Sequence, residues 1–200
     1  MWALDIETDT TVPAHSDGMA PAGLDPRVSP ILCLAVAADT EPTFVTEGEE
    51  PALLEAFVDW WQQLDPDDTV VTWNGSRFDF PFIGYRLVEH DLPVPFDYWA
   101  YRADPGERQP IVTSGGVWHV SGHIDLHNVL HDYRTRHRIS GLKATLASAG
   151  IPHRQPTVSG AQSGRIPAAL LADYCAADAE ATLSLAKTVH PYFLDLWKVQ

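Results

Sequence analysis

Trp2-Ala3-Leu4-Asp5-Ile6-Glu7, close to the amino terminus, alternates apolar and acidic residues. Successive side chains of a β-strand point to opposite faces, so Leu4 and Ile6 share one face while Asp5 and Glu7 share the other. A solvated strand face gives the same pattern, and acids are common in a chain with 27 Asp and Glu among 200 residues. The strand therefore points to a site only if further acids converge on it.

A second acid follows a predicted strand in the middle of the chain. The β-branched run Thr69-Val70-Val71-Thr72-Trp73 leads into Asn74-Gly75, which is typical of a buried strand that feeds a turn. Apolar residues from Phe82 to Leu87, with Pro81 in the first turn, predict a helix beyond it. Asp79 is therefore expected at a strand-to-helix junction, where it either caps the helix or projects into a site.

The third stretch is the segment from Ala168 to Leu185, which is rich in Ala and Leu and contains neither Gly nor Pro. It predicts a helix on which Tyr174 and Asp178, four residues apart, share one face. Small residues at Ala177 and Ala181 would let another backbone or a ligand approach. A surface pair on an amphipathic helix remains the alternative for this motif alone.

Four carboxylates would converge if the three stretches meet in the fold. They would repel one another, and burying them is costly unless cations neutralise them or protons are taken up. A divalent metal site resolves this conflict.

The three motifs together resemble those of a known family, the 3′→5′ exonuclease domains of family B DNA polymerases and their stand-alone relatives. These belong to the Asp-Glu-Asp-Asp superfamily. Asp5 to Thr8 is similar to the first exonuclease motif, Asn74 to Phe82 to the second, and Tyr174 to Asp178 to the third. Relatives that use a catalytic histidine place it five residues before the last acid, and Asp173 stands there, so the tyrosine subclass is the match. The resemblance covers nearly the whole chain.

The resemblance implies an α/β, RNase H-like fold with a mixed central β-sheet flanked by helices, in a single domain over residues 1–200. It also implies two divalent ions, Mg²⁺ or Mn²⁺, that lie about 3.5 to 4 Å apart and together promote hydrolysis of a phosphodiester. Asp5 would contact both ions, Glu7 and Asp178 would complete the site of the water-activating ion, and Asp79 would hold the second. Tyr174 would orient the attacking water, since an ordinary tyrosine pKa of about 10 makes its hydroxyl a poor base at neutral pH.

The expected substrate is a single-stranded DNA 3′ end, with RNA as the enzymatic alternative. Phe78 would stack on terminal bases and Asn74 would bind the terminal nucleotide; alternatively, Phe78 packs in the core and Asn74 serves the turn. A catalytically silent module that holds single strands or docks a polymerase or helicase is the alternative from another class.

Composition limits these expectations. The formal charge of -14 argues against tight binding of nucleic acid, so we expect weak, salt-sensitive binding, aided by a more basic partner and by one basic stretch. That stretch comprises His131, Arg134, Arg136, His137, Arg138 and Lys143. Two cysteines, no apolar run of membrane-spanning length and no signal-like amino terminus favour a cytoplasmic protein without further domains before the first motif.

The remaining segments of the sequence carry weaker patterns. We expect strands at 31–38 and 43–46, a helix at 52–64, and irregular structure at 92–118 and 151–167, where Pro and Gly are frequent. A zinc stripe of His119, His123, His127 and His131 is discounted, because Gly122 and a strand around Ile124 interrupt the helix that it would need. Asp125 is interpreted as the cap of a short helix rather than as a residue that orients the site. Lys143 is interpreted as a solvated helical lysine rather than a phosphate ligand.

Overall fold

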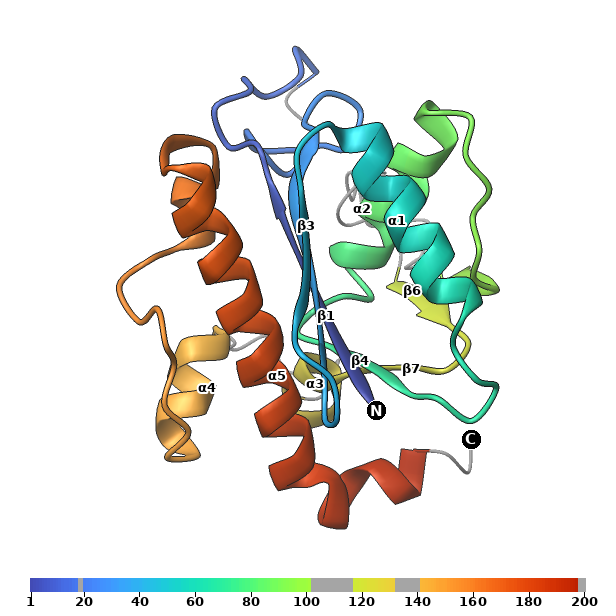
Figure 1. The fold of residues 1–200 in the computed structure, drawn as a ribbon, viewed down its shortest axis with the longest axis vertical. Coiled ribbons are helices and arrows are strands. Elements are labelled where there is room, and N and C mark those ends of the chain that lie inside the picture. The colour runs from blue at the N-terminus through green and yellow to red at the C-terminus, as the bar shows by residue number, and fades with distance from the viewer. Residues whose placement is uncertain (18–19, 102–116, 132–140, 198–200) are drawn as a thin grey trace.

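A computed structural model describes residues 1–17, 20–101, 117–131 and 141–197. Its centre is a sheet of five strands in the order β3-β2-β1-β4-β7 among the described residues (Figure 1). The strands are β1 (Trp2–Thr8), β2 (Ile31–Ala38), β3 (Phe44–Glu47), β4 (Val70–Thr72) and β7 (His123–Asp125). β1 pairs antiparallel with β2 and parallel with β4, and β4 pairs parallel with β7, so the sheet is mixed as predicted.

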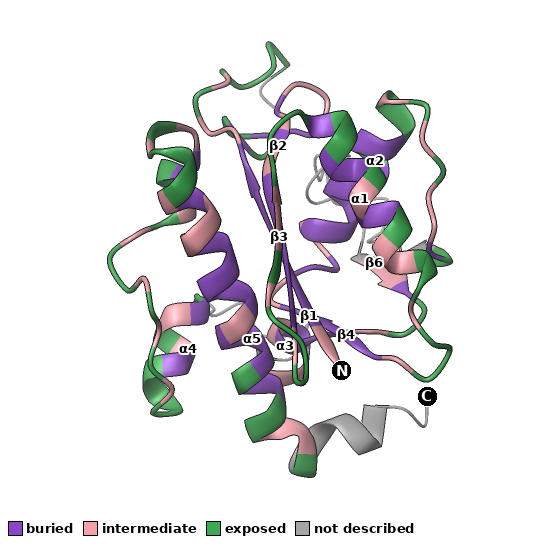
Figure 2. Cartoon of the chain, in the orientation of Figure 1, coloured by how far each residue is buried: buried purple, intermediate pink, exposed green. Residues whose placement is uncertain are grey.

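Helices cover both faces of the sheet. The long helix α5 (Ala168–Trp197) lies along one face, whereas α1 (Glu50–Gln62) and α2 (Asp79–Glu89) lie on the other (Figure 1). Alternation along β1 explains the division, because Ala3 packs with residues of α5 while Leu4 and Ile6 pack with residues of α1 and α2. Figure 2 shows the resulting buried layers on either side of the strands. Asp5 and Glu7 therefore face α5.

The structure confirms the expected helices and moves their boundaries. α1 starts at Glu50 with a proline in its first turn and buries Leu53, Leu54 and Phe57. α2 starts at Asp79 and buries Phe82, Ile83 and Leu87. α5 continues beyond the predicted end at Leu185 to Trp197. The five residues after Leu185 contain neither Gly nor Pro, and the helix also includes Pro191, a residue that usually ends or kinks a helix. Two shorter helices, α3 (Leu126–His131) and α4 (Leu142–Ser148), precede it.

Two segments expected to be irregular contain regular structure. Residues 92–118 include β5 (Tyr98–Tyr101) and β6 (Val117–Val120), which form a separate antiparallel pair. The aromatic sequence of β5 favours a strand, and the many nearby prolines masked that signal. In 151–167, η1 (Gly160–Arg165) is a 3₁₀ helix whose capping box joins Ser159 and Gln162.

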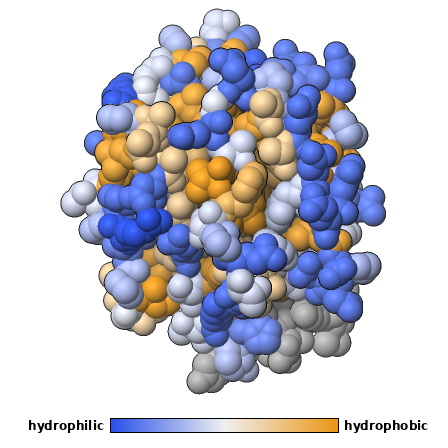
Figure 3. Space-filling model, viewed as in Figure 1, coloured by the Kyte–Doolittle hydropathy of each residue, from blue (hydrophilic) through white to orange (hydrophobic). Residues whose placement is uncertain are grey.

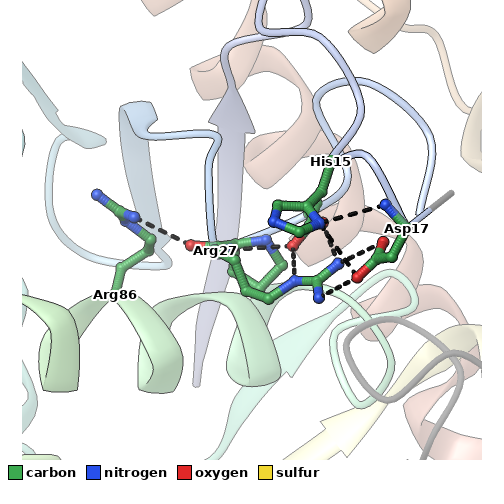
Figure 4. A network of polar contacts seen from close by, with 6 residues as sticks. His15, Asp17, Arg27 and Arg86 are labelled. Atoms are coloured by element: carbon green, nitrogen blue, oxygen red, sulfur yellow. Dashed lines mark hydrogen bonds and ion pairs between the residues drawn. The ribbon is translucent and has the colours of Figure 1, made fainter. Parts of the chain in front are cut away.

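The loop between β1 and β2 is fixed by arginines. Arg27 donates to Asp17 at 2.6 Å, as Figure 4 shows. It also donates to Asp25 at 2.5 Å. Arg86 of α2 reaches the same loop through the carbonyl oxygen of Pro26, at 3.0 Å. The arginines therefore tie this loop to itself and to the helical layer.

The face in Figure 3 is mostly polar, with hydrophobic side chains gathered near its middle. Large exposed hydrophobic residues include Phe44 on β3 and Val88 on α2. Within the described residues, no helix combines the length and the apolar character needed to cross a lipid bilayer.

Candidate active site

Three acids from the two ends of the chain meet between β1 and α5. Asp5 and Glu7 come from β1 and Asp178 from α5, and each offers a carboxylate oxygen that lies within 4.8 Å of the other two. Glu7 is 7% and Asp178 8% exposed. These residues are the acids predicted in the first and third motifs, now in one cluster.

Close contact between β1 and α5 makes this cluster possible. The thiol of Cys175 lies 3.5 Å from the carbonyl oxygen of Asp5 and donates to it. Ala177, Ala179 and Ala181 of α5 are all buried. Their small side chains let the helix approach the sheet, and Asp178 is thereby carried to the two acids of the strand.

The acids disfavour one another's charge. Burial raises the pKa of Asp5 well above its ordinary value, and the charges of Asp178, Glu7 and Asp79 raise it further. Burial followed by the charge of Asp178 also raises the pKa of Glu7. Oδ2 of Asp5 is buried without a hydrogen-bond partner among the described residues. Such an oxygen has lost its hydration and has gained nothing in return.

Asp79 lies beside the cluster but is not one of its three members. It is the first residue of α2, and the N-cap position belongs to Phe78, so the alternative that Asp79 caps the helix is wrong. The backbone N–H of Ile6 on β1 lies near its carboxylate and opposes the rise in its pKa. Burial raises the pKa of Asp79 to about 8. Its charge acts on both Asp5 and Glu7.

Tyr174 lies one helical turn before Asp178 and is 4% exposed. Burial raises the pKa of its hydroxyl above the ordinary value, and the charges of Asp178 and Glu7 raise it further. Gly160 of η1 closes this side: a Cβ there would lie 3.5 Å from Oε2 of Glu7 and 3.9 Å from the Tyr174 hydroxyl. The hydroxyl therefore stands next to the carboxylates.

The turn before Asp79 is held by Asp125. Asn74 has a φ of 69°, a left-handed conformation that Asn tolerates, which agrees with its predicted role in the turn. The backbone N–H groups of Asn74 and Ser76 donate to the two carboxylate oxygens of Asp125 at 2.9 and 3.0 Å. Asp125 also accepts from the backbone and side chain of Asn128, and so it caps α3 as predicted. It serves both the cap and the turn.

Phe78 is only partly buried on this turn. Its ring packs on Phe82 with 5.4 Å between centroids. The ring is therefore anchored by the apolar cluster and keeps some exposed surface next to Asp79.

The chain shares its sequence pattern and fold with known exonuclease domains. A family model described as a predicted 3′-5′ exonuclease related to the exonuclease domain of PolB matches residues 34–185. The chain belongs to this family. Among solved structures, it is similar to the family B DNA polymerase from the hyperthermophilic archaeon Pyrobaculum calidifontis, with 25% identity and a TM-score of 0.65 over 95% of this chain. The chain spans 24% of that polymerase chain. No curated protein matches it.

Membership of this PolB-related family agrees with the predicted RNase H-like fold. The carboxylate cluster is built from residues of the first and third exonuclease motifs. The matched range includes Asp79, Tyr174 and Asp178, whereas Asp5 and Glu7 precede it on β1.

The contacts of His153 and Lys143 at the site do not follow from the sequence, and the prediction of a solvated Lys143 is wrong. Nε2 of His153 lies 2.5 Å from Oδ1 of Asp178. Lys143 is not solvated, because its ammonium group donates to the carbonyl oxygens of Gln155, at 2.8 Å, and Val158, and lies 4.8 Å from the Tyr174 ring centroid. Both residues lie far from the acids in sequence, with no fixed spacing to them, so no local pattern identifies their contacts.

The four histidines lie on three different elements, so no continuous helix carries them, as the sequence predicts. His119 is on β6, His123 on β7, and His127 and His131 on α3. His123 pairs instead with the Thr72 hydroxyl at 2.8 Å. Within the predicted basic stretch, Arg134, Arg136, His137 and Arg138 lie outside the described residues.

Proposed function

We propose that residues 1–200 form one metal-dependent 3′→5′ exonuclease domain that removes nucleotides from single-stranded DNA ends. The observation that carries this proposal is the set of three carboxylates within 4.8 Å, from Asp5, Glu7 and Asp178, in a chain of the PolB-related exonuclease family. Without cations, such a cluster is an electrostatic liability that a fold would not be expected to keep.

The donor set fits magnesium or manganese. Both ions prefer hard oxygen ligands, and the partnerless Oδ2 of Asp5 is an oxygen of this kind. Asp5, Glu7 and Asp178 would hold one ion, and Asp5 with Asp79 the second. Divalent ions bound there would supply a nucleophilic water at neutral pH and stabilise the charge on the leaving oxygen.

The chain's own residues would then orient the reactants. Tyr174 keeps its proton at neutral pH because its pKa is raised, so its hydroxyl acts as a hydrogen-bond donor or acceptor toward the water rather than as a base. The water oxygen would form a bond to the terminal phosphorus while the bond from phosphorus to the 3′ oxygen of the preceding nucleotide breaks. The products are a nucleoside 5′-monophosphate and a strand shortened by one residue that ends in a 3′-hydroxyl.

Phe78 and Asn74 are the proposed substrate contacts. Phe78 stands next to Asp79 with part of its ring exposed, so a terminal base could stack on it. Asn74 lies on the same turn, with its backbone held by Asp125. The relation to a polymerase exonuclease favours DNA over RNA, and a polymerase or helicase is the proposed protein partner.

An end-labelled oligonucleotide assay tests this function. Single-stranded DNA and RNA are incubated with the chain in Mg²⁺, Mn²⁺ or chelator, and we expect stepwise shortening of DNA from the 3′ end that the chelator abolishes. Asp5→Ala should nearly abolish shortening because it removes a metal ligand. Tyr174→Phe should slow it while Mn²⁺ binding persists.

The matched control is Asp67→Ala, which removes an exposed acid from the loop before β4. Undiminished shortening by Asp5→Ala would refute the proposal. Shortening of RNA alone would identify an exoribonuclease, and binding without shortening would identify a silent module.

A further inference from the structure

The ring of His153 has a defined orientation against Asp178. The side chain is 4% exposed, and its Nε2 lies 2.5 Å from Oδ1 of Asp178. Its other ring nitrogen, Nδ1, lies 3.0 Å from the backbone nitrogen of Gln155. That backbone N–H can only donate, so Nδ1 accepts and the ring proton is on Nε2. His153 therefore donates a hydrogen bond to the Asp178 carboxylate.

The segment that carries His153 is fastened to α5 on both sides of Asp178. Arg154 pairs with Asp173, five residues before Asp178, and with Glu180, two residues after it, at 3.1 Å. The Gln155 side chain also donates to Asp173. From α4, Lys143 binds the carbonyl oxygens of residues 155 and 158. These contacts fix the imidazole relative to the helix that carries Asp178.

We propose that His153 is a positioning residue for the metal site: its Nε2–H holds the Asp178 carboxylate in the orientation in which it meets Asp5 and Glu7. This inference rests on the proposed function. Asp178 comes from a helix, whereas the other two acids come from one strand, so the third oxygen reaches the cluster only if the Asp178 side chain is oriented toward them. The hydrogen bond from His153 restricts the orientation of that carboxylate. Hydrogen bonds to ligating carboxylates commonly contribute about 10- to 100-fold to metal affinity.

A blocking role predicts the opposite sign. If His153 occupied an oxygen that a cation needs, its removal would strengthen metal binding. The direction of the change in affinity therefore separates positioning from blocking.

The experiment is a Mn²⁺ titration of the full chain without substrate, by calorimetry or by the EPR signal of free Mn²⁺. His153→Ala should weaken binding by about 10- to 100-fold. His153→Gln should restore most of the affinity, because its amide N–H reaches about as far as Nε2. His153→Asn, whose amide is one methylene shorter, should not. His15→Ala removes an exposed histidine from the loop before β2 and should leave binding unchanged.

Each outcome bears on the proposal. Mn²⁺ affinity that is unchanged or increased in His153→Ala would overturn it. If the alanine variant fails to fold, equal affinities of the Gln and Asn variants would overturn it equally well. A wild-type chain that binds no Mn²⁺ would overturn both this inference and the proposed function. If the wild-type chain binds Mn²⁺ and His153→Ala binds it with the same affinity, only the positioning role is refuted.

Discussion

Asp125 connects the turn of the second motif to the rest of the fold. Its two oxygens accept from the backbone of Asn74 and Ser76, and from both the backbone and the side chain of Asn128. The sequence predicted the cap of α3, because an Asp before a short apolar run is typical of that role. It did not predict the bonds to Asn74 and Ser76, which depend on β4 and β7 lying side by side.

Replacing Asp125 should therefore cost more than a lost helix cap. In Asp125→Ala, buried N–H groups of the turn and of α3 lose their acceptor, and each such group costs about 1 to 3 kcal/mol. We expect the free energy of unfolding in urea to fall by about 3 kcal/mol or more. Asp67→Ala is the control, and a change below about 0.5 kcal/mol in Asp125→Ala would contradict this account.

At the scale of elements, β1 and α5 were predictable because each carries its own pattern. The alternation of Leu4 and Ile6 with Asp5 and Glu7 fixed both the strand and the face of its acids, and the uninterrupted Ala and Leu run fixed the helix. β5 and η1 were not predictable in the same way. Nearby prolines obscured the four residues of β5, and η1 depends on the Ser159 and Gln162 box rather than on apolar periodicity.

Glu50 joins three elements and gives the fold a pH-dependent contact. It accepts from the backbone N–H of Ile31 on β2 at 2.7 Å and from Arg86 on α2 at 2.5 Å, with His90 also within reach. Burial alone would raise the pKa of Glu50, but the hydrogen bonds from Arg86, Ile31 and His90 outweigh it and hold that pKa below the ordinary value.

The contribution of Glu50 to stability should therefore be complete above the ordinary glutamate pKa of 4.5 and should be lost as the pH falls through the lower folded value. Glu50→Gln should lower the free energy of unfolding by about 3 kcal/mol at pH 7, because Arg86 is left buried without its anion. The deficit should shrink in acid, as measured by urea unfolding across pH. Glu55→Gln, exposed on the same helix, is the control, and a deficit independent of pH would disprove the assignment.

For the whole molecule, the formal charge of -14 and the buried acids act in the same direction. A raised pKa in the folded state means that the native chain holds protons more tightly than the unfolded chain, so the acids of the cluster cost stability as the pH rises toward neutrality. Ligands that bind only the native state recover stability by mass action.

Thermal unfolding at pH 7 should show this balance. Saturating Mn²⁺ should raise the melting temperature of the wild-type chain. At a Mn²⁺ concentration 100 times the dissociation constant, the free energy of unfolding should increase by about 2.7 kcal/mol. Asp5→Asn should melt higher than the wild type in chelator, because one repelling charge is gone, yet gain little from Mn²⁺. A variant that melts lower in chelator and gains as much from the metal would contradict the site.

The carboxylate cluster joins Asp5 to Asp178, and this separation has a consequence for synthesis of the chain. A nascent polypeptide that has made β1 carries two acids without the third until α5 has left the ribosome. The proposed nuclease site is therefore incomplete during synthesis of the segment that separates the two elements.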